Sequence, residues 1–182
     1  MKGFTLLELL VVIALMALVL VLALPNFKGI KTEQALKNTA AEIQSALRTA
    51  QNNASSGLKC DKANTPVGKW SFIINSTTSY TVKPDDPLCN SAGKEYDLSK
   101  SGVRICSVSA SSHCDEPQPV AGAALSSLSY SNINATLSFS ISSCPSANGD
   151  FIIKVDTSTS GDCDANNYKL IKVDSGGRIY VQ

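Results

Sequence analysis

An apolar run near the start of the sequence limits what this chain can fold into. It extends from Phe4 to Leu24, and only Thr5 and Glu8 within it are not apolar. As a helix the run is about 30 Å long, which matches the roughly 30 Å hydrocarbon core of a bilayer. We therefore expect a membrane-spanning helix. A carboxylate inside such a span costs a few kcal/mol unless it has a partner, so Glu8 needs an explanation.

Two ordinary interpretations of the run fit it poorly. A cleaved secretory signal has a shorter apolar stretch, a small-residue cleavage site and no carboxylate in its hydrophobic core. A single-pass anchor fits the length but leaves Glu8 unexplained.

The segment "KGFTLLE" at residues 2–8 resembles the class III signal of type IV prepilins, which pilins and pseudopilins share. The resemblance implies that prepilin peptidase cleaves between Gly3 and Phe4 and that the new amine of Phe4 is N-methylated. In that family a carboxylate at the place of Glu8 lies near the terminal amine of a neighbouring subunit, and a buried charge with such a partner is tolerated. Pro25 stands where the family has a helix-bending proline.

The same resemblance implies a location and a set of partners. The amino terminus lies in the cytoplasm, and the chain crosses the bacterial inner membrane once before it joins a periplasmic or extracellular filament. The implied partners are prepilin peptidase, other pilin subunits, the inner-membrane assembly platform and, before assembly, lipid. Lys28 and Lys31 after the run outnumber Lys2 before it, so a positive-inside count does not favour this orientation. A pilus (fimbrium), a type II secretion pseudopilus and a competence filament all remain compatible with the motif.

Six cysteines indicate that the rest of the chain matures outside the reducing cytosol. They form no C-x-x-C pair of the kind that binds zinc, so we expect disulfides. We expect each cysteine to pair with its neighbour in the sequence, and other pairings or reduced thiols are the alternative. The expected pairs are Cys60 with Cys89, Cys106 with Cys114, and Cys144 with Cys163.

A helical pattern continues beyond the apolar run. Apolar residues recur every three or four positions, which predicts a helix with one face packed against a partner. A short coiled coil is the alternative. We expect a leader at 1–3, a transmembrane or filament-core helix at 4–25 and an amphipathic helix at 26–56. The apolar stripe consists of Leu36, Ala40, Ile43, Leu47, Ala50 and Ala54.

Residues 57–182 read as one disulfide-containing, β-rich domain. Short segments rich in aromatic and β-branched residues alternate with polar turns. We expect an α+β pilin fold, in which a long N-terminal helix packs on an antiparallel sheet, and loops over 84–102, 109–122 and 156–167. The expected strands are "WSFIIN" and "SYTVK" as a hairpin, "VRICSV", "ATLSFSI", "FIIKV", and "YKLIKV" and "RIYV" joined through "DSGG".

The ending "YKLIKVDSGGRIYV" resembles the closing hairpin of H-type minor pseudopilins and related minor pilins. Major pilins usually keep a disulfide-bounded loop near the carboxyl end. Here Cys144 and Cys163 stop well before Gln182. This departure argues against a simple major-pilin assignment, and the sequence does not distinguish a major from a minor subunit.

We find no catalytic constellation in the sequence and expect a structural subunit without a cofactor, not an enzyme. His113 stands beside Cys114 in a segment without a nucleophile motif, and we expect it to be solvated. Asp162, Asp164 and Asn166 alternate like the oxygen ligands of a calcium loop, but the later bidentate glutamate is missing. An Asx-rich turn is the preferred interpretation.

Three cations near the closing hairpin suggest an alternative function. Lys169, Lys172 and Arg178 would form a basic patch if they shared one surface. The alternative is a minor pilin that acts as a binding module, for DNA uptake or adhesion, at the filament tip. With a net charge of +1 in 182 residues, the chain is not a strongly basic nucleic-acid-binding protein.

Overall fold

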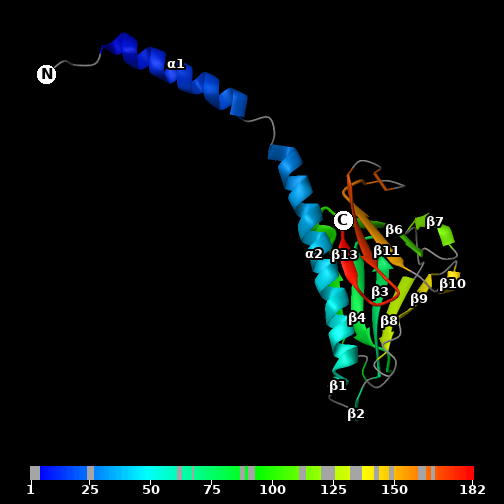
Figure 1. Cartoon of the computed structure of the whole chain (residues 1–182). Coiled ribbons are helices and arrows are strands. Elements are labelled where there is room, and N and C mark those ends of the chain that lie inside the picture. The colour runs from blue at the N-terminus through cyan, green and yellow to red at the C-terminus, as the bar shows by residue number, and fades with distance from the viewer. Residues whose placement is uncertain are drawn as a thin grey trace. The chain divides into compact units, whose positions relative to one another are not determined.

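The computed structural model divides the chain into two compact units, Met1–Gln34 and Ala35–Gln182. Figure 1 shows the helices and strands of both. The structure describes residues 5–23, 27–60, 63–66, 68–86, 89, 93–110, 114–119, 126–131, 137–141, 144–147, 150–159, 163–164 and 167–182.

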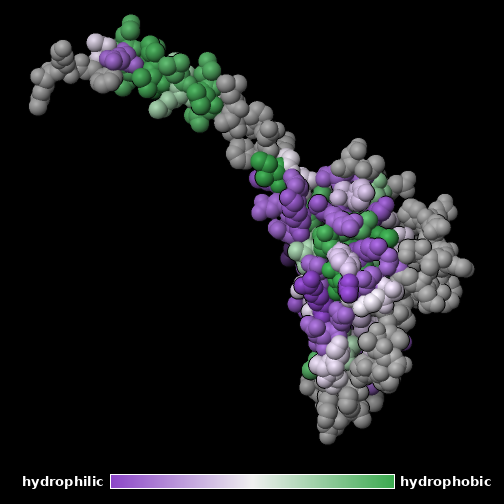
Figure 2. Space-filling view, viewed as in Figure 1, coloured by the Kyte–Doolittle hydropathy of each residue, from purple (hydrophilic) through white to green (hydrophobic). Residues whose placement is uncertain are grey.

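The first unit contains helix α1 (Leu6–Ala23) and the beginning of helix α2 (Phe27–Ser55). The large apolar side chains of α1 from Leu6 to Leu20 are 43–82% exposed, and they form the green surface of this helix in Figure 2. Among the described residues, no helix is both long and apolar enough to cross a membrane. Pro25, the predicted bend, lies outside the described residues.

The apolar stripe of α2 is buried, as the sequence predicts. Each of its six residues, from Leu36 to Ala54, is at most 1% exposed. Two backbone hydrogen bonds cap the carboxyl-terminal end of this helix. The N–H of Gly57 donates to the carbonyl of Ala54, and the N–H of Leu58 donates to the carbonyl of Asn53. Gly57 has φ 58°, the left-handed conformation that this type of helix end requires.

A six-stranded antiparallel sheet has the order β10-β9-β8-β3-β4-β5. The predicted hairpin of "WSFIIN" and "SYTVK" is confirmed, because β3 pairs with β4 and Phe72 lies opposite Val82. The strands are β3 (Lys69–Ser76), β4 (Ser79–Pro84), β5 (Lys94–Asp97), β8 (Ser126–Ser131), β9 (Leu137–Ile141) and β10 (Cys144–Ala147).

A five-stranded antiparallel sheet has the order β13-β12-β11-β6-β7. The predicted closing hairpin is confirmed, because β12 pairs with β13. Two short strands, β1 (Lys59–Cys60) and β2 (Ala63–Pro66), pair separately. The five strands are β6 (Arg104–Ala110), β7 (Cys114–Pro119), β11 (Phe151–Asp156), β12 (Tyr168–Val173) and β13 (Ile179–Val181).

Both sheets and α2 contribute to one hydrophobic core. In strands such as β4 and β11, every second residue faces this core, as the pleat of a strand requires. In β11, for example, Phe151, Ile153 and Val155 are fully buried. The fold is therefore α+β, with the second unit's part of α2 packed on antiparallel sheets, consistent with a pilin fold.

Two of the predicted loops contain regular structure. The segment 84–102 holds β5 and a 3₁₀ helix at Ser99–Ser101, and the segment 109–122 holds β7. Both strands lie at sheet edges. Edge strands carry charges and prolines and lack a buried apolar alternation, so the pattern that identifies central strands misses them.

Two glutamines of α2 hold the closing hairpin. Gln44 Nε2 donates to the carbonyl of Ile179 at 3.2 Å, and Gln51 Nε2 donates to that of Gly177 at 3.1 Å. Gly177 has φ 78°, and a Cβ built on it would lie 2.9 Å from Gln51 Nε2. The hairpin thus needs glycine here both for its backbone conformation and for the approach of the helix.

Gly177→Ala should destabilise the domain by about 2 kcal/mol or more, because it adds left-handed strain and displaces the Gln51 amide. Chemical denaturation of the full chain in detergent measures this loss. Gly102→Ala is the matched control, since Gly102 has φ 67° but no atom within 4 Å of its added Cβ. Equal losses in the two variants would contradict a role for the Gln51 contact.

Candidate functional site

The amino-terminal end of α1 is capped by Thr5. The helix begins at Leu6, and Thr5 Oγ1 accepts a hydrogen bond from the backbone N–H of Glu8 at 3.3 Å. The Thr5 carbonyl also accepts from Glu8 N at 3.1 Å and from Leu9 N at 3.3 Å. Thr5-x-x-Glu8 therefore has the sequence and the hydroxyl contact of a capping box.

This cap places Glu8 in the first turn of an apolar helix. A carboxylate is favourable there because the helix dipole is positive at its amino-terminal end. Glu8 is exposed, and so are the apolar side chains around it, such as Leu7 and Leu9. The exposed carboxylate is available to a cation on another molecule. Gly3 and Phe4, the predicted cleavage and methylation residues, lie outside the described residues.

Comparison with known families tests this region directly. Residues 1–24 match the family model of the prokaryotic N-terminal methylation motif. The chain carries the class III prepilin signal of type IV pilins and pseudopilins. No curated protein and no solved structure matches the chain.

The prepilin signal confirms several expectations at a coarse level. It supports a type IV pilin-like or pseudopilin subunit, and proteins of that family are structural subunits. It implies processing by prepilin peptidase, assembly with other pilin subunits, and a chain that is first membrane-anchored and then filament-associated. The match ends at residue 24 and does not extend into the β-rich domain.

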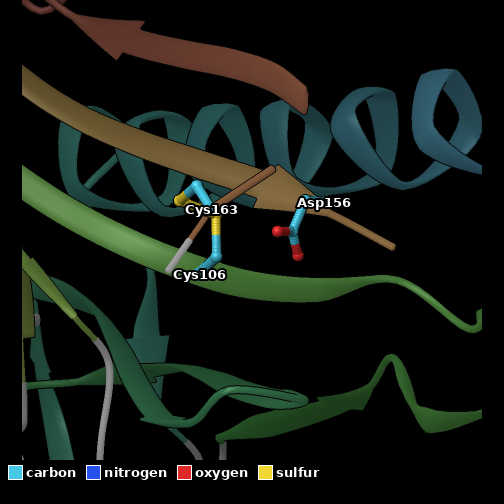
Figure 3. A group of neighbouring side chains, drawn as sticks. All are labelled: Cys106, Asp156 and Cys163. Carbon is cyan, nitrogen blue, oxygen red and sulfur yellow. A yellow bond between two sulfur atoms is a disulfide. The ribbon is translucent and has the colours of Figure 1, made fainter. Parts of the chain in front are cut away.

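A disulfide joins Cys106 of β6 to Cys163, with a Cα–Cα distance of 5.2 Å. The predicted pairs Cys106 with Cys114 and Cys144 with Cys163 are therefore wrong. In the register of β6 and β7, Cys114 lies opposite Ala110. Ala110 is the last residue of β6, whereas Cys106 lies near the beginning of that strand. The segment after β11, the neighbour of β6 in the sheet, carries Cys163 to Cys106 instead (Figure 3).

Of the other four cysteines, the structure describes the side chain of Cys89. Cys89 is buried and disulfide-bonded, and none of the cysteines whose side chains the structure describes is free. The side chains of Cys60, Cys114 and Cys144 lie outside the described part. The pairing of Cys60 with Cys89 stays a prediction.

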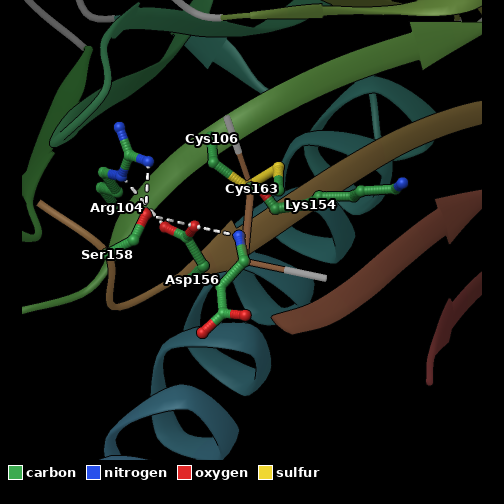
Figure 4. Close-up of a disulfide and its surroundings, with 7 residues drawn as sticks. Arg104, Cys106, Lys154, Asp156, Ser158 and Cys163 are labelled. Carbon is green, nitrogen blue, oxygen red and sulfur yellow. Dashed lines mark hydrogen bonds and ion pairs between the residues drawn. A yellow bond between two sulfur atoms is a disulfide. The ribbon is translucent and has the colours of Figure 1, made fainter. Parts of the chain in front are cut away.

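A buried carboxylate lies beside the Cys106–Cys163 disulfide. Asp156, the last residue of β11, is fully buried and accepts three hydrogen bonds (Figure 4). Arg104 Nε donates to Oδ1 at 3.0 Å, while the Ser158 hydroxyl and the Asp164 N–H donate to Oδ2 at 2.6 and 2.9 Å. Arg104 Nη2 also donates to the Ser158 hydroxyl.

The electrostatics of Asp156 favour its ionised form. Burial by itself would raise the pKa of this carboxyl group, but the hydrogen bonds from Ser158, Asp164 and Arg104, together with the Arg104 charge, outweigh burial and lower the pKa. Asp156 is therefore a buried anion, and the Arg104 guanidinium is its cationic partner. The Arg104 side chain is itself only 16% exposed, so the ion pair is largely shielded from solvent.

Cys106, Asp156 and Cys163 also have the donor types of a metal site. Their sulfurs and a carboxylate oxygen all lie within 4.8 Å of one another. Metals bind thiolates, however, and both sulfurs are used in the disulfide. Asp156 already accepts three hydrogen bonds. In its oxidised form this cluster is a structural clamp.

The predicted basic patch is not a single surface. Lys169 and Lys172 are three residues apart on β12, so they lie on opposite faces of the sheet. Lys172 Nζ forms an ion pair with Asp150 Oδ2 at 2.6 Å. Arg178 is exposed at the end of the closing turn.

The remaining candidate residues lie mostly outside the described part. His113, Asp162 and Asn166 are among them. The backbone of Asp164 is described, and its N–H donates to Asp156. The calcium interpretation of this segment stays a prediction.

Sequence reasoning did not identify Asp156, Arg104 or Ser158. A weak signal was present, because an aspartate ends the largely apolar strand "FIIKVD" and an arginine begins "RICSV". The two charges face each other only once the antiparallel register, with Asp156 opposite Arg104, is known.

Proposed function

We propose that this chain is a structural subunit of a type IV pilus-like filament, cleaved between Gly3 and Phe4, N-methylated on Phe4 and assembled through α1. The single observation that carries the proposal is the prepilin signal over residues 1–24. The inner-membrane assembly platform is the partner that extracts the subunit from lipid.

The exposed apolar surface of α1 supports this mode of assembly. Side chains that are 43–82% exposed in the single chain need apolar contacts, from lipid before assembly and from other α1 helices afterwards. On this proposal the Glu8 carboxylate pairs with the Phe4 amine of a neighbouring subunit. Methylation leaves that amine able to carry a positive charge, so the pair is neutral within the apolar filament core.

Mass spectrometry of sheared filaments tests the processing step. We expect an amino-terminal peptide that begins at Phe4 and carries a methyl group on its amine. An intact Met1, or a chain that begins near Leu24, would contradict the proposal. A strain without prepilin peptidase is the control and should retain residues 1–3.

The alternative is a binding module at the filament tip. Its proposed DNA site rests on Lys169, Lys172 and Arg178, and the opposite orientations of the first two speak against it. A scarce subunit that binds DNA with a steep salt dependence would favour this alternative. An abundant subunit that forms filaments alone would favour the structural role.

A further inference from the structure

We propose that the Cys106–Cys163 disulfide and the Asp156 carboxylate act as one coupled clamp, in which oxidation of the two cysteines is what allows Asp156 to be buried. The clamp consists of Arg104, Cys106, Asp156, Ser158, Cys163 and Asp164. It does not depend on the proposed filament function, because all six residues lie in the second unit, far along the chain from the prepilin signal.

The disulfide holds one of the three donors to Asp156 in place. Asp164 directly follows Cys163 and donates its N–H to Asp156 Oδ2 at 2.9 Å. Cys163 in turn is bonded to Cys106, two residues along β6 from Arg104. The bond therefore fixes the segment that carries the Asp164 amide to the same strand that supplies the arginine.

The sulfurs also shield the carboxylate. They lie within 4.8 Å of an Asp156 oxygen, and Cys106 is 2% exposed. A buried carboxylate is costly unless its oxygens are hydrogen-bonded and its charge is paired. Without the disulfide, no covalent bond holds Cys163 and the adjacent Asp164 to β6. Water can then replace the Asp164 amide, and Asp156 loses its buried state.

The coupling must act in both directions. If the disulfide favours the closed Asp156 network, the network favours the disulfide by the same factor. The step itself joins two thiols. As the S–S bond forms, the disulfide of a protein oxidant breaks, and that oxidant takes up the two electrons and, in net, the two protons to become a dithiol. Because that chemistry belongs to oxidising compartments, the clamp closes only after the domain has left the cytosol.

Amide exchange of the full chain in detergent tests the first direction. In Cys106→Ala/Cys163→Ala, we expect the Asp164 amide to exchange at least about tenfold faster than in the oxidised native chain. Core amides such as that of Ile153 should keep their protection, which shows that the sheet is still folded. Cys89→Ala, which removes a different disulfide, is the matched control and should leave Asp164 protected. An equally protected Asp164 without the clamp disulfide would overturn the proposal.

A glutathione titration tests the second direction. Asp156→Asn should shift the redox equilibrium of the Cys106–Cys163 pair toward the thiols by about tenfold, as measured by alkylation and mass spectrometry. Asp150→Asn is the control, because it breaks the partly exposed ion pair with Lys172 on the same sheet. An equilibrium for Asp156→Asn equal to that of the native chain would show that the carboxylate and the disulfide are independent, and would overturn the coupling.

Discussion

Glu8→Leu should strongly reduce incorporation into filaments while leaving membrane insertion and cleavage intact. Leucine suits an apolar helix better than glutamate does, so insertion is not the sensitive step. An assembled subunit without the carboxylate would leave the Phe4 amine of its neighbour unpaired in an apolar core. An unpaired buried ammonium raises the free energy of the assembled state, and we expect this to reduce assembly by at least about tenfold. Fractionation of cells that express only the variant, followed by shearing, measures processed protein in filaments and in membranes.

The variant Glu8→Gln distinguishes the two roles of Glu8, which are to supply a negative charge and to cap helix α1. A glutamine can still serve as the third helical residue of a capping box with Thr5, but it cannot neutralise an amine. If the charge is what matters, Glu8→Gln should fail to assemble as Glu8→Leu does. Normal amounts of sheared filament from Glu8→Gln would instead assign Glu8 to capping of α1 and contradict the proposed pairing.

The elements that the sequence predicted well are those with a local signal. The stripe from Leu36 to Ala54 repeats with helical spacing over several turns, and every one of its residues is buried. The hairpin of β12 and β13 combines two apolar strands with a glycine-rich turn, and Gly177 adopts the positive φ that such a turn uses. Periodicity and turn chemistry are both properties of neighbouring residues, so a single sequence is sufficient to show them.

The features that the sequence did not predict depend on pairing between distant segments. Cys106 and Cys163 are 57 residues apart and meet only because β11 lies beside β6. The same pairing brings Asp156 opposite Arg104. The N-terminal signal lies between these cases, since its motif is local and matches a known family, while the contact of Thr5 with Glu8 appears only in the structure.

Asp156→Asn should destabilise the domain strongly at neutral pH, and the loss should shrink in acid. The variant leaves the Arg104 charge without its buried partner and weakens three hydrogen bonds, which together cost about 3 kcal/mol. Chemical denaturation of the full oxidised chain in detergent, repeated between about pH 7 and pH 3, measures the difference from the native chain.

The direction of the pH effect follows from the lowered pKa of Asp156 in the folded domain. An aspartate in the unfolded chain titrates near pH 3.9. Because the folded pKa lies below that value, the contribution of the ionised group is fully present above about pH 5 and is lost as pH falls through the folded pKa. The asparagine does not titrate, so the difference between the native chain and the variant should begin to shrink near pH 4 and should shrink further as the pH falls toward the folded pKa. Asp150→Asn should show a much smaller difference at pH 7, because its ion pair with Lys172 is partly exposed to solvent. A difference for Asp156→Asn that stays constant down to about pH 3 would mean that its cost arises from packing and not from the buried charge.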